Sequence, residues 1–326
     1  MDRSNACENV ALDEIDFALI KALEIDARKS CQELADKVGT TTTTAWRRLQ
    51  RLISEQVITF VTIPDPVALG FRVSALIGIN TAPGRSDTTA EVLADFPNVQ
   101  SINLTTGRYD MLLFSIHRTQ RELMDFLDEQ LGDIPDVTHA ETMITLRQVK
   151  ASWRHLLNPH DASGEILPRR RSLTPTEQAL IRELETDPRK SLTDLGKGIG
   201  MSRMSASRKL QTLLDENVLK VVIIPDSAKL GFGTQAGIFV RVRPGRINAV
   251  AQALGAHKRI HHVVVTAGRF DMLLWGIFRD SNELSDFIRT HVGGLPGVIS
   301  HETMLDVSVP KRSFALLTQG SLLNNL

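Results

Sequence analysis

Apolar side chains recur every three or four positions in three short stretches near the start of the chain. Residues 13–24, 31–38 and 42–54 each gather their apolar residues on one face, which predicts three amphipathic helices. Ser30 and Glu33 have the spacing of a capping box at the start of the second helix, and a glycine follows its last turn. The third helix has a buried side and a polar side, so the three helices predict a helix–turn–helix unit.

Beyond the third helix the apolar pattern changes to one that favours strands. The stretch Val57–Ile63 is rich in β-branched residues and ends at a Pro-Asp pair, which predicts a strand beside the helices, the wing of a winged helix. The following segments predict strand, helix, strand, strand, helix and strand over Phe71–Thr81, Arg85–Phe96, Val99–Thr106, Met111–His117, Gln120–Leu131 and Val137–Leu146. This βαββαβ order is that of ferredoxin-like domains.

The whole pattern returns 161 residues later with no net insertion. Asp26-Ala27-Arg28-Lys29-Ser30 returns as Asp187-Pro188-Arg189-Lys190-Ser191, and Gly107-Arg108-Tyr109-Asp110 returns as Gly268-Arg269-Phe270-Asp271. The predicted fold class is therefore α+β, with two copies of a winged helix–turn–helix domain followed by a ferredoxin-like βαββαβ domain. A chain of this kind can form its own pseudo-dimer, and the sequence leaves open whether the pairing closes within one chain or between two.

The stretches rich in Pro, Gly and polar residues predict the domain boundaries. We expect helix–turn–helix domains at residues 1–64 and 173–225, ferredoxin-like domains at 65–157 and 226–318, and a basic linker at 158–172. The linker contains the run Pro168-Arg169-Arg170-Arg171 between Ser, Gly and Asn residues, which is typical of a flexible connection.

Composition narrows the class of protein. The 326 residues are 42% hydrophobic and 23% charged, as in ordinary globular proteins, and the formal net charge of zero argues against a general polyanion binder. Residues 1–64 carry a slight excess of acidic groups, whereas residues 168–224 carry an excess of basic ones. No apolar run approaches 18 residues, so we expect no membrane span. Cys7 and Cys31 have no metal-ligand spacing and predict no disulfide framework, which favours a cytoplasmic location.

The polar side of each third helix is the first candidate site. Its polar positions are Thr42, Thr43, Trp46, Arg47, Gln50 and Arg51 in the first copy, and Arg203, Ser205, Ser207, Arg208 and Gln211 in the second. Arginine can bond both guanine acceptors in the major groove and glutamine can pair with adenine, so this face suits double-stranded DNA. The arginines of the linker would add phosphate contacts. The alternative is a solvated basic face or a helical unit used for protein contacts.

The repeated Gly-Arg-Tyr/Phe-Asp turn is the second candidate site. Its predicted effector-binding residues are Gly107, Tyr109 and Asp110 in the first copy, and Gly268, Phe270 and Asp271 in the second. Each aspartate could offer a carboxylate to the ammonium group of a small ligand. The alternative is a plain hairpin, because glycine and aspartate are common turn residues.

Catalytic chemistry has weak support in the sequence. His261 and His262 precede a strand of the second copy, where the first copy has Gln100 and Ser101. No Ser/His/Asp set, metal cluster or Gly-rich phosphate loop is apparent, so we expect no catalytic residues, no metal and no cofactor.

The combination of these motifs resembles the leucine-responsive regulatory (Lrp/AsnC) family of prokaryotic transcription factors. The resemblance covers about residues 12–157 and 173–318, and it is carried by the combination of the helix–turn–helix with the Gly107–Leu113 and Gly268–Leu274 segments rather than by either alone. It implies DNA-binding domains, effector domains that dimerise through their sheets, and an amino acid or related metabolite as effector. It also implies a homo-oligomer, here a dimer or tetramer of the tandem chain.

The fusion of two units departs from the usual family pattern, and a second group shares it. Siroheme decarboxylases of heme biosynthesis look similar and also pair two such units, but they tend to have degraded third helices. Both third helices are intact and basic in this chain, and only His261 and His262 favour the enzyme. We therefore expect a transcriptional regulator, with the decarboxylase as the alternative.

Overall fold

The computed structural model describes residues 11–152, 156–157 and 171–318. The chain opens with three helices, α1 (Glu14–Ile25), α2 (Cys31–Val38) and α3 (Thr42–Ser54). Asp13 caps α1, and the predicted capping box of Ser30 and Glu33 is present at the start of α2. Gly39 ends α2 in the left-handed conformation with φ of 71°, which glycine adopts at little cost. The helices predicted from periodicity are thus confirmed.

A strand and a βαββαβ unit follow the helices. Their bounds are β1 (Ile58–Pro64), β2 (Val73–Thr81), α4 (Ser86–Ala94), β3 (Val99–Thr105), β4 (Met111–His117), α5 (Gln120–Asp125), η1 (Phe126–Leu131) and β5 (Val137–Ala151). The order is the predicted one. However, β5 continues past the predicted end at Leu146, because its last residues pair with a strand of the second copy.

The second copy repeats the same order. Its elements are α6 (Pro175–Thr186), α7 (Leu192–Gly198), α8 (Arg203–Asp215), β6 (Leu219–Pro225), β7 (Thr234–Val242), α9 (Ile247–Gly255), β8 (Ile260–Ala267), β9 (Met272–Phe278), α10 (Ser281–Phe287), η2 (Ile288–Val292) and β10 (Val298–Arg312). Thr174 and Glu177 form the predicted capping box of α6, with Pro175 at the first helical position.

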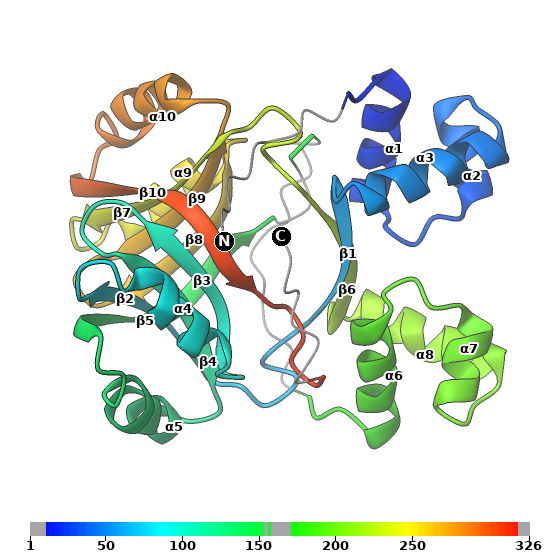
Figure 1. The fold of residues 1–326 in the computed structure, drawn as a ribbon, viewed down its shortest axis with the longest axis horizontal. Coiled ribbons are helices and arrows are strands. Elements are labelled where there is room, and N and C mark those ends of the chain that lie inside the picture. The colour runs from blue at the N-terminus through cyan, green and yellow to red at the C-terminus, as the bar shows by residue number, and fades with distance from the viewer. Residues whose placement is uncertain (1–10, 153–155, 158–170, 319–326) are drawn as a thin grey trace.

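The eight long strands of both copies close into one barrel. Its strand order is β10-β3-β4-β2-β5-β8-β9-β7, so each copy contributes four strands. The pairings β5–β8 and β10–β3 are antiparallel and join the two copies. The question that the sequence left open is therefore answered in the structure, where the pseudo-dimer closes within one chain. Figure 1 shows the barrel on the left and the two three-helix units on the right.

The strands expected as wings form a shared ribbon instead. β1 pairs with β6 in antiparallel register, with Ile58 opposite Pro225, Val61 opposite Val222 and Pro64 opposite Leu219. Each of these strands thus finds its hydrogen-bonding partner in the other copy. In Figure 1 the ribbon stands between the barrel on the left and the two three-helix units on the right.

Two buried lysines hold the helices of one copy to the last strand of the other. Lys150 Nζ donates to the carbonyl oxygens of Gly255 and His257 at the end of α9, at 2.8 and 3.3 Å. Lys311 Nζ, at the equivalent position of β10, donates to Ala94 and Phe96 at the end of α4. A cation at a helix C-terminus offsets the exposed carbonyls there. These contacts stabilise the pseudo-dimer, because each copy is bonded through its last strand to a helix of the other.

Candidate functional site

The third helix of the first copy presents the predicted polar face to solvent. Thr41 caps α3 by accepting a hydrogen bond from the backbone nitrogen of Thr44, while the apolar side packs inward through Ala45, Leu49 and Leu52. The exposed positions are Thr42, Thr43, Trp46, Arg47 and Gln50. Trp46 is 54% exposed, so most of its large aromatic side chain does not contribute to the core.

The equivalent helix of the second copy has the same organisation. Ser202 caps α8, and Ala206, Leu210 and Leu213 form its buried side. Arg203, Ser205, Arg208 and Gln211 are exposed, and Ser207 is half-buried. Met204 is 74% exposed beside them and was not singled out from the sequence. Both helices therefore combine a capped, polar N-terminal turn with an exposed arginine, as a major-groove reader needs.

One predicted contact residue of α3 is held by an internal carboxylate. Arg51 forms an ion pair with Asp16, whose side chain is fully buried, and the arginine keeps 39% of its side chain exposed. Arg48, which sequence reasoning missed, binds both Asp13 and Asp16 at 2.7 and 3.1 Å. Asp16 lies on α1, distant in sequence, so only the fold brings these charges together.

The linker arginines divide between the described and undescribed parts of the chain. Arg169 and Arg170 lie outside the described residues. Arg171 donates two hydrogen bonds to Glu177 at 3.0 Å and one to Glu216 at 2.7 Å. Although burial raises the pKa of Glu177, the hydrogen bonds from Arg171 and Thr174 outweigh it and lower the pKa to about 2. Arg171 thus anchors the start of α6.

The two three-helix units also contact each other directly through a reciprocal pair of arginines. Arg28 donates to the carbonyl oxygens of Pro188 and Lys190 at 2.5 and 2.9 Å. Arg189, the equivalent residue of the second copy, donates to Lys29 at 2.8 Å. Together with the β1–β6 ribbon, these bonds fix the distance between the two exposed helix faces.

The Gly-Arg-Tyr-Asp turn of the first copy is built largely from internal contacts. Tyr109 is buried and its hydroxyl donates to Glu141 Oε2 at 2.6 Å, so burial and this hydrogen bond raise the pKa of Tyr109. Its ring lies against Gly78, where a Cβ would come within 2.5 Å of ring carbons. Asp110 Oδ2 accepts from the backbone nitrogen of Thr81 at 2.8 Å.

The turn of the second copy has the same backbone role, and both turns lie between the copies. Asp271 Oδ2 accepts from the backbone nitrogen of Val242 at 2.8 Å, and Phe270 is buried like Tyr109. Gly107, with φ of 109°, lies against Met304 of the second copy, while Gly268 approaches Met143 of the first. The structure therefore brings the six predicted effector residues to the junction of the copies, with one oxygen of each aspartate bonded to the backbone.

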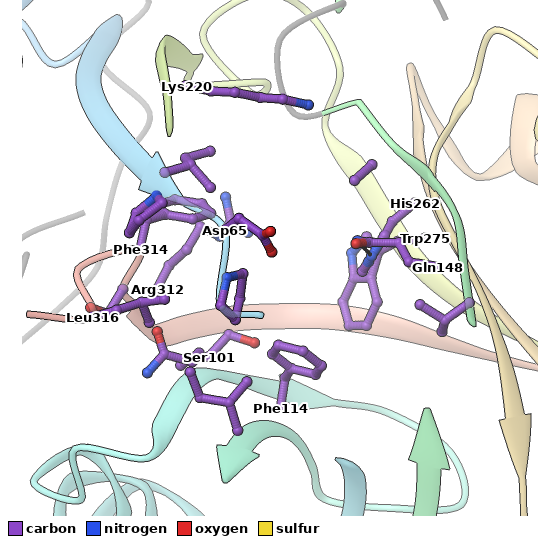
Figure 2. A pocket seen from close by; sticks show the side chains of 18 of the residues that line it. Asp65, Ser101, Phe114, Gln148, Lys220, His262, Trp275, Arg312, Phe314 and Leu316 are labelled. Carbon is purple, nitrogen blue, oxygen red and sulfur yellow. Dashed lines mark hydrogen bonds between the residues drawn. The ribbon is translucent and has the colours of Figure 1, made fainter. Parts of the chain in front are cut away.

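A cavity of about 230 Å³, which was not predicted from the sequence, lies between the barrel and the β1–β6 ribbon. Figure 2 shows Trp275, His262 and Gln148 on one side of it, with Arg312 and Phe314 on the other. Its lining combines apolar side chains with convergent polar groups, as small-molecule sites do.

A buried carboxyl group orients one wall of the cavity. Asp306 Oδ2 accepts hydrogen bonds from Asn103 Nδ2 at 3.0 Å and Trp275 Nε1 at 3.1 Å. Burial raises the pKa of Asp306 to about 7, although these bonds and the charge of Arg312 oppose the shift. Burial also lowers the pKa of the Arg312 guanidinium and lowers that of His262 to about 4.

The family model described as the Lrp/AsnC ligand binding domain matches residues 74–154 and 235–316, and that of the AsnC-type helix-turn-helix domain matches residues 12–53. The chain belongs to the Lrp/AsnC family. The predicted resemblance is thus confirmed, and the two ligand-binding matches fall on the two halves of the barrel.

Curated relatives of the Lrp/AsnC chain are single-unit proteins. The HTH-type transcriptional regulator FL11 of Pyrococcus horikoshii is 36% identical over 142 residues, which are 43% of this chain and 93% of the relative. The transcriptional regulator AzlB of Bacillus subtilis is 30% identical over 145 residues, covering 43% of this chain and 92% of AzlB. Its relatives are therefore transcriptional regulators, each corresponding to about one copy.

A solved structure resembles both copies together. The siroheme decarboxylase NirDL matches with a TM-score of 0.64 and 14% identity, covering 94% of this chain and 96% of the NirDL chain. At this identity the likeness shows a shared fold. Tandem pairing of two Lrp/AsnC-type units is thus an arrangement that this chain shares with an enzyme.

The histidines that favoured the enzyme were expected before a strand, but both lie within β8, and His262 also lines the cavity. His261 is buried, and its Nδ1 lies 3.2 Å from the carbonyl oxygen of Ser152. His262 Nε2 lies 2.6 Å from Gln148 Nε2. Among the described residues, no group of three His, Cys, Asp or Glu side chains is placed to hold a metal ion. None of the helices in those ranges is long and apolar enough to cross a membrane.

Proposed function

We propose that this chain is a sequence-specific DNA-binding transcriptional regulator that supplies both halves of a two-fold reader from one polypeptide. The observation that carries the proposal is the pair of capped, exposed helices α3 and α8 on one frame. The β1–β6 ribbon and the two arginines that cross between the units hold that frame together. A preset distance between two helices suits two successive major grooves of one duplex.

The proposed reading residues divide by the contacts that their exposure allows. We assign base contacts to Arg47, Gln50, Arg208 and Gln211, because arginine and glutamine can bond two acceptors or a donor–acceptor pair on a base edge. Thr42, Thr43, Trp46, Arg203, Ser205 and Ser207 would contact phosphates, sugars or thymine methyl groups near the helix N-termini. The ion pair with Asp16 holds the guanidinium of Arg51 in place while 39% of the side chain stays exposed. We therefore assign Arg51 a phosphate contact and not a base contact.

Removal of one base-reading arginine from each helix tests this assignment. In a gel-shift at moderate salt on the DNA upstream of the protein's own gene, Arg47→Ala with Arg208→Ala should weaken binding by about 1–3 kcal/mol per lost base contact. Arg121→Ala is the matched control, because Arg121 is 89% exposed on α5 and distant from both reader helices. Equal affinity of the double variant and the control would refute the reader assignment.

We further propose that a small metabolite of the amino-acid class controls DNA affinity or assembly. The loops that carry Gly107, Tyr109, Asp110, Gly268, Phe270 and Asp271 lie between the copies, where a ligand could favour one arrangement of the barrel over another. Under this proposal, Asp110→Ala with Asp271→Ala abolishes the effect of added amino acids in the gel-shift while leaving DNA binding within about twofold. A normal response in the double variant would place the effector elsewhere.

Self-assembly of the chain is part of the same proposal. Ile144 and Leu146 on β5 are exposed, and so are Leu305 and Val307 at the equivalent positions of β10. Exposed apolar side chains in pairs on two strands favour association between copies of the chain. Light scattering of the purified protein measures its mass in solution, and we expect the mass of a dimer or tetramer of the chain.

The alternative function is that of a siroheme-decarboxylase-like enzyme. The observation in its favour is the fold shared with NirDL along nearly the whole chain. The intact helices α3 and α8, each capped and with an exposed polar face, disfavour it. Copurified tetrapyrrole, seen as strong absorbance near the blue end of the visible spectrum, would support the enzyme.

A further inference from the structure

The cavity lies where equivalent positions of the two copies meet. Four pairs of its lining residues are related by the 161-residue offset. These pairs are Ser101 with His262, Asn103 with Val264, Phe114 with Trp275, and Ala151 with Arg312. A dimer of two identical chains would place the same side chain on both sides of such a cavity. In this chain each of the four pairs differs, so the cavity has two unlike ends.

Arg312 provides the strongest polar feature of one end. Its guanidinium forms no hydrogen bond or ion pair with any described residue, although the charges of Asp306 and Asp226 act on it. Arg312 is half-buried and lines the cavity, so its guanidinium donors are available to a ligand there. The planar guanidinium is suited to bind a carboxylate through two parallel hydrogen bonds.

The opposite side carries the aromatic rings, with His262 and Gln148 hydrogen-bonded to each other beside Trp275. Trp275 and Phe114 approach the cavity from β9 and β4, and the hydrogen bond from Trp275 to Asp306 fixes the indole in place. Leu76, Val264 and Leu273 add apolar surface to the lining. Rigid aromatic rings offer a large contact area to an apolar group without much loss of side-chain entropy.

We propose that the cavity binds one small carboxylate with an apolar side chain, its carboxylate on Arg312 and its apolar part against Trp275 and Phe114. The volume suits a molecule the size of an amino acid or a 2-oxo acid, which share this chemistry. The proposal rests on the regulatory function above and adds a second small-molecule site to the one proposed at the Gly-Arg-Tyr/Phe-Asp loops, none of whose residues lines the cavity.

The walls of the cavity connect such a ligand to the DNA-binding units. Ile63, Pro64, Lys220 and Val222 of the β1–β6 ribbon line it, and so does Leu316 after β10. Leu316 packs in the core of the second three-helix unit, and its backbone nitrogen donates to Glu185 on α6 at 2.8 Å. A ligand that pushes on these segments changes the frame that sets the distance between α3 and α8.

Trp275 supplies a local probe for the test. The chain has three tryptophans, so Trp46→Phe with Trp153→Phe leaves Trp275 as the sole emitter. In this background, L-leucine and 4-methyl-2-oxopentanoate are titrated separately, with isopentylamine as a compound that lacks the carboxylate. We expect at least one of the two carboxylates to change Trp275 emission saturably, and the amine to have no effect. Saturation by neither carboxylate, or by the amine as well, would overturn the proposal.

Variants locate the ligand within the cavity. Arg312→Met keeps much of the side-chain volume and should weaken binding at least tenfold, whereas Arg121→Ala, on the exposed face of α5, should bind as tightly as the parent. Ala151→Leu fills the cavity without changing a charge, so it should also abolish binding. It provides the test if Arg312→Met fails to fold. Unchanged binding in Arg312→Met or in Ala151→Leu would overturn the cavity site. Gel-shifts of the ligand-free parent test DNA binding independently, so failure of the cavity site and failure of the regulatory function remain distinguishable.

Discussion

Asp306 is an ionisable residue whose protonation changes markedly on folding. Its carboxyl group is buried between Asn103 and Trp275, and its Oδ1 has no hydrogen-bond partner among the described residues. Burial raises its pKa from 3.8 to about 7, so the folded protein holds the neutral form over a wide range in which the unfolded chain is ionised. Folding therefore becomes less favourable as pH rises through this range.

Replacement of this carboxyl group by an amide should flatten the pH dependence. Below about pH 4 the carboxyl group of Asp306 is neutral in the folded and the unfolded protein. Between pH 4 and 7 the unfolding free energy of the wild type should fall by on the order of 2–4 kcal/mol, whereas that of Asp306→Asn lacks this fall. The difference in unfolding free energy between variant and wild type, measured with urea at pH 5 and pH 8, should favour the variant more at pH 8. A difference that does not change with pH would show that Asp306 is ionised in the folded protein.

For single residues, the sequence predicted which side chains are exposed better than it predicted their hydrogen-bond and ion-pair partners. The polar positions of α3 and α8 followed from helical periodicity, and nearly all of them are exposed. The partners of Arg51, Arg48 and Asp306 did not follow, because Asp16, Asn103 and Trp275 lie on other elements and meet them only after folding. The Gly-Arg-Tyr/Phe-Asp turns were correctly placed as turns, whereas the contacts of their glycines with Met304 and Met143 of the other copy depend on the closed barrel.

Among the elements, the β1–β6 ribbon differs most from what one copy alone predicts. Each strand was recognised from its β-branched run, but a strand can pair with any exposed edge, and the sequence does not specify the partner. The extension of β5 has the same origin, since its last residues pair with β8. Pairing between copies thus explains the largest departures from the predicted elements.

The reciprocal arginines between the three-helix units should control how the two readers cooperate. Arg28→Ala with Arg189→Ala removes three hydrogen bonds to backbone carbonyls and loosens the spacing of α3 and α8. We expect affinity for a complete operator to fall about tenfold, about 1.4 kcal/mol, because more freedom is lost on binding. A duplex that contains a single half-site serves as the control, and its affinity should not change. An unaltered ratio of full-site to half-site affinity would mean that the ribbon alone sets the spacing.

The whole molecule behaves as a pseudo-dimer whose two halves have diverged. The barrel, the ribbon and the lysine contacts at the ends of α4 and α9 repeat on both sides. The reader faces differ, since Trp46 is replaced by Ser207 and Arg51 by Thr212, and the two ends of the cavity differ as well. Fusion of the copies frees each half to change without affecting the other, which two identical subunits cannot do.

Selection of binding sites from random duplex DNA tests this central claim most directly. The wild type should enrich two unlike half-sites whose centres lie about one helical turn, about 10 base pairs, or a multiple of it apart. Arg208→Ala should relax base preference in one half-site and leave the other unchanged. Enrichment of two identical half-sites, equal relaxation of both by Arg208→Ala, or no enrichment at all would contradict the account.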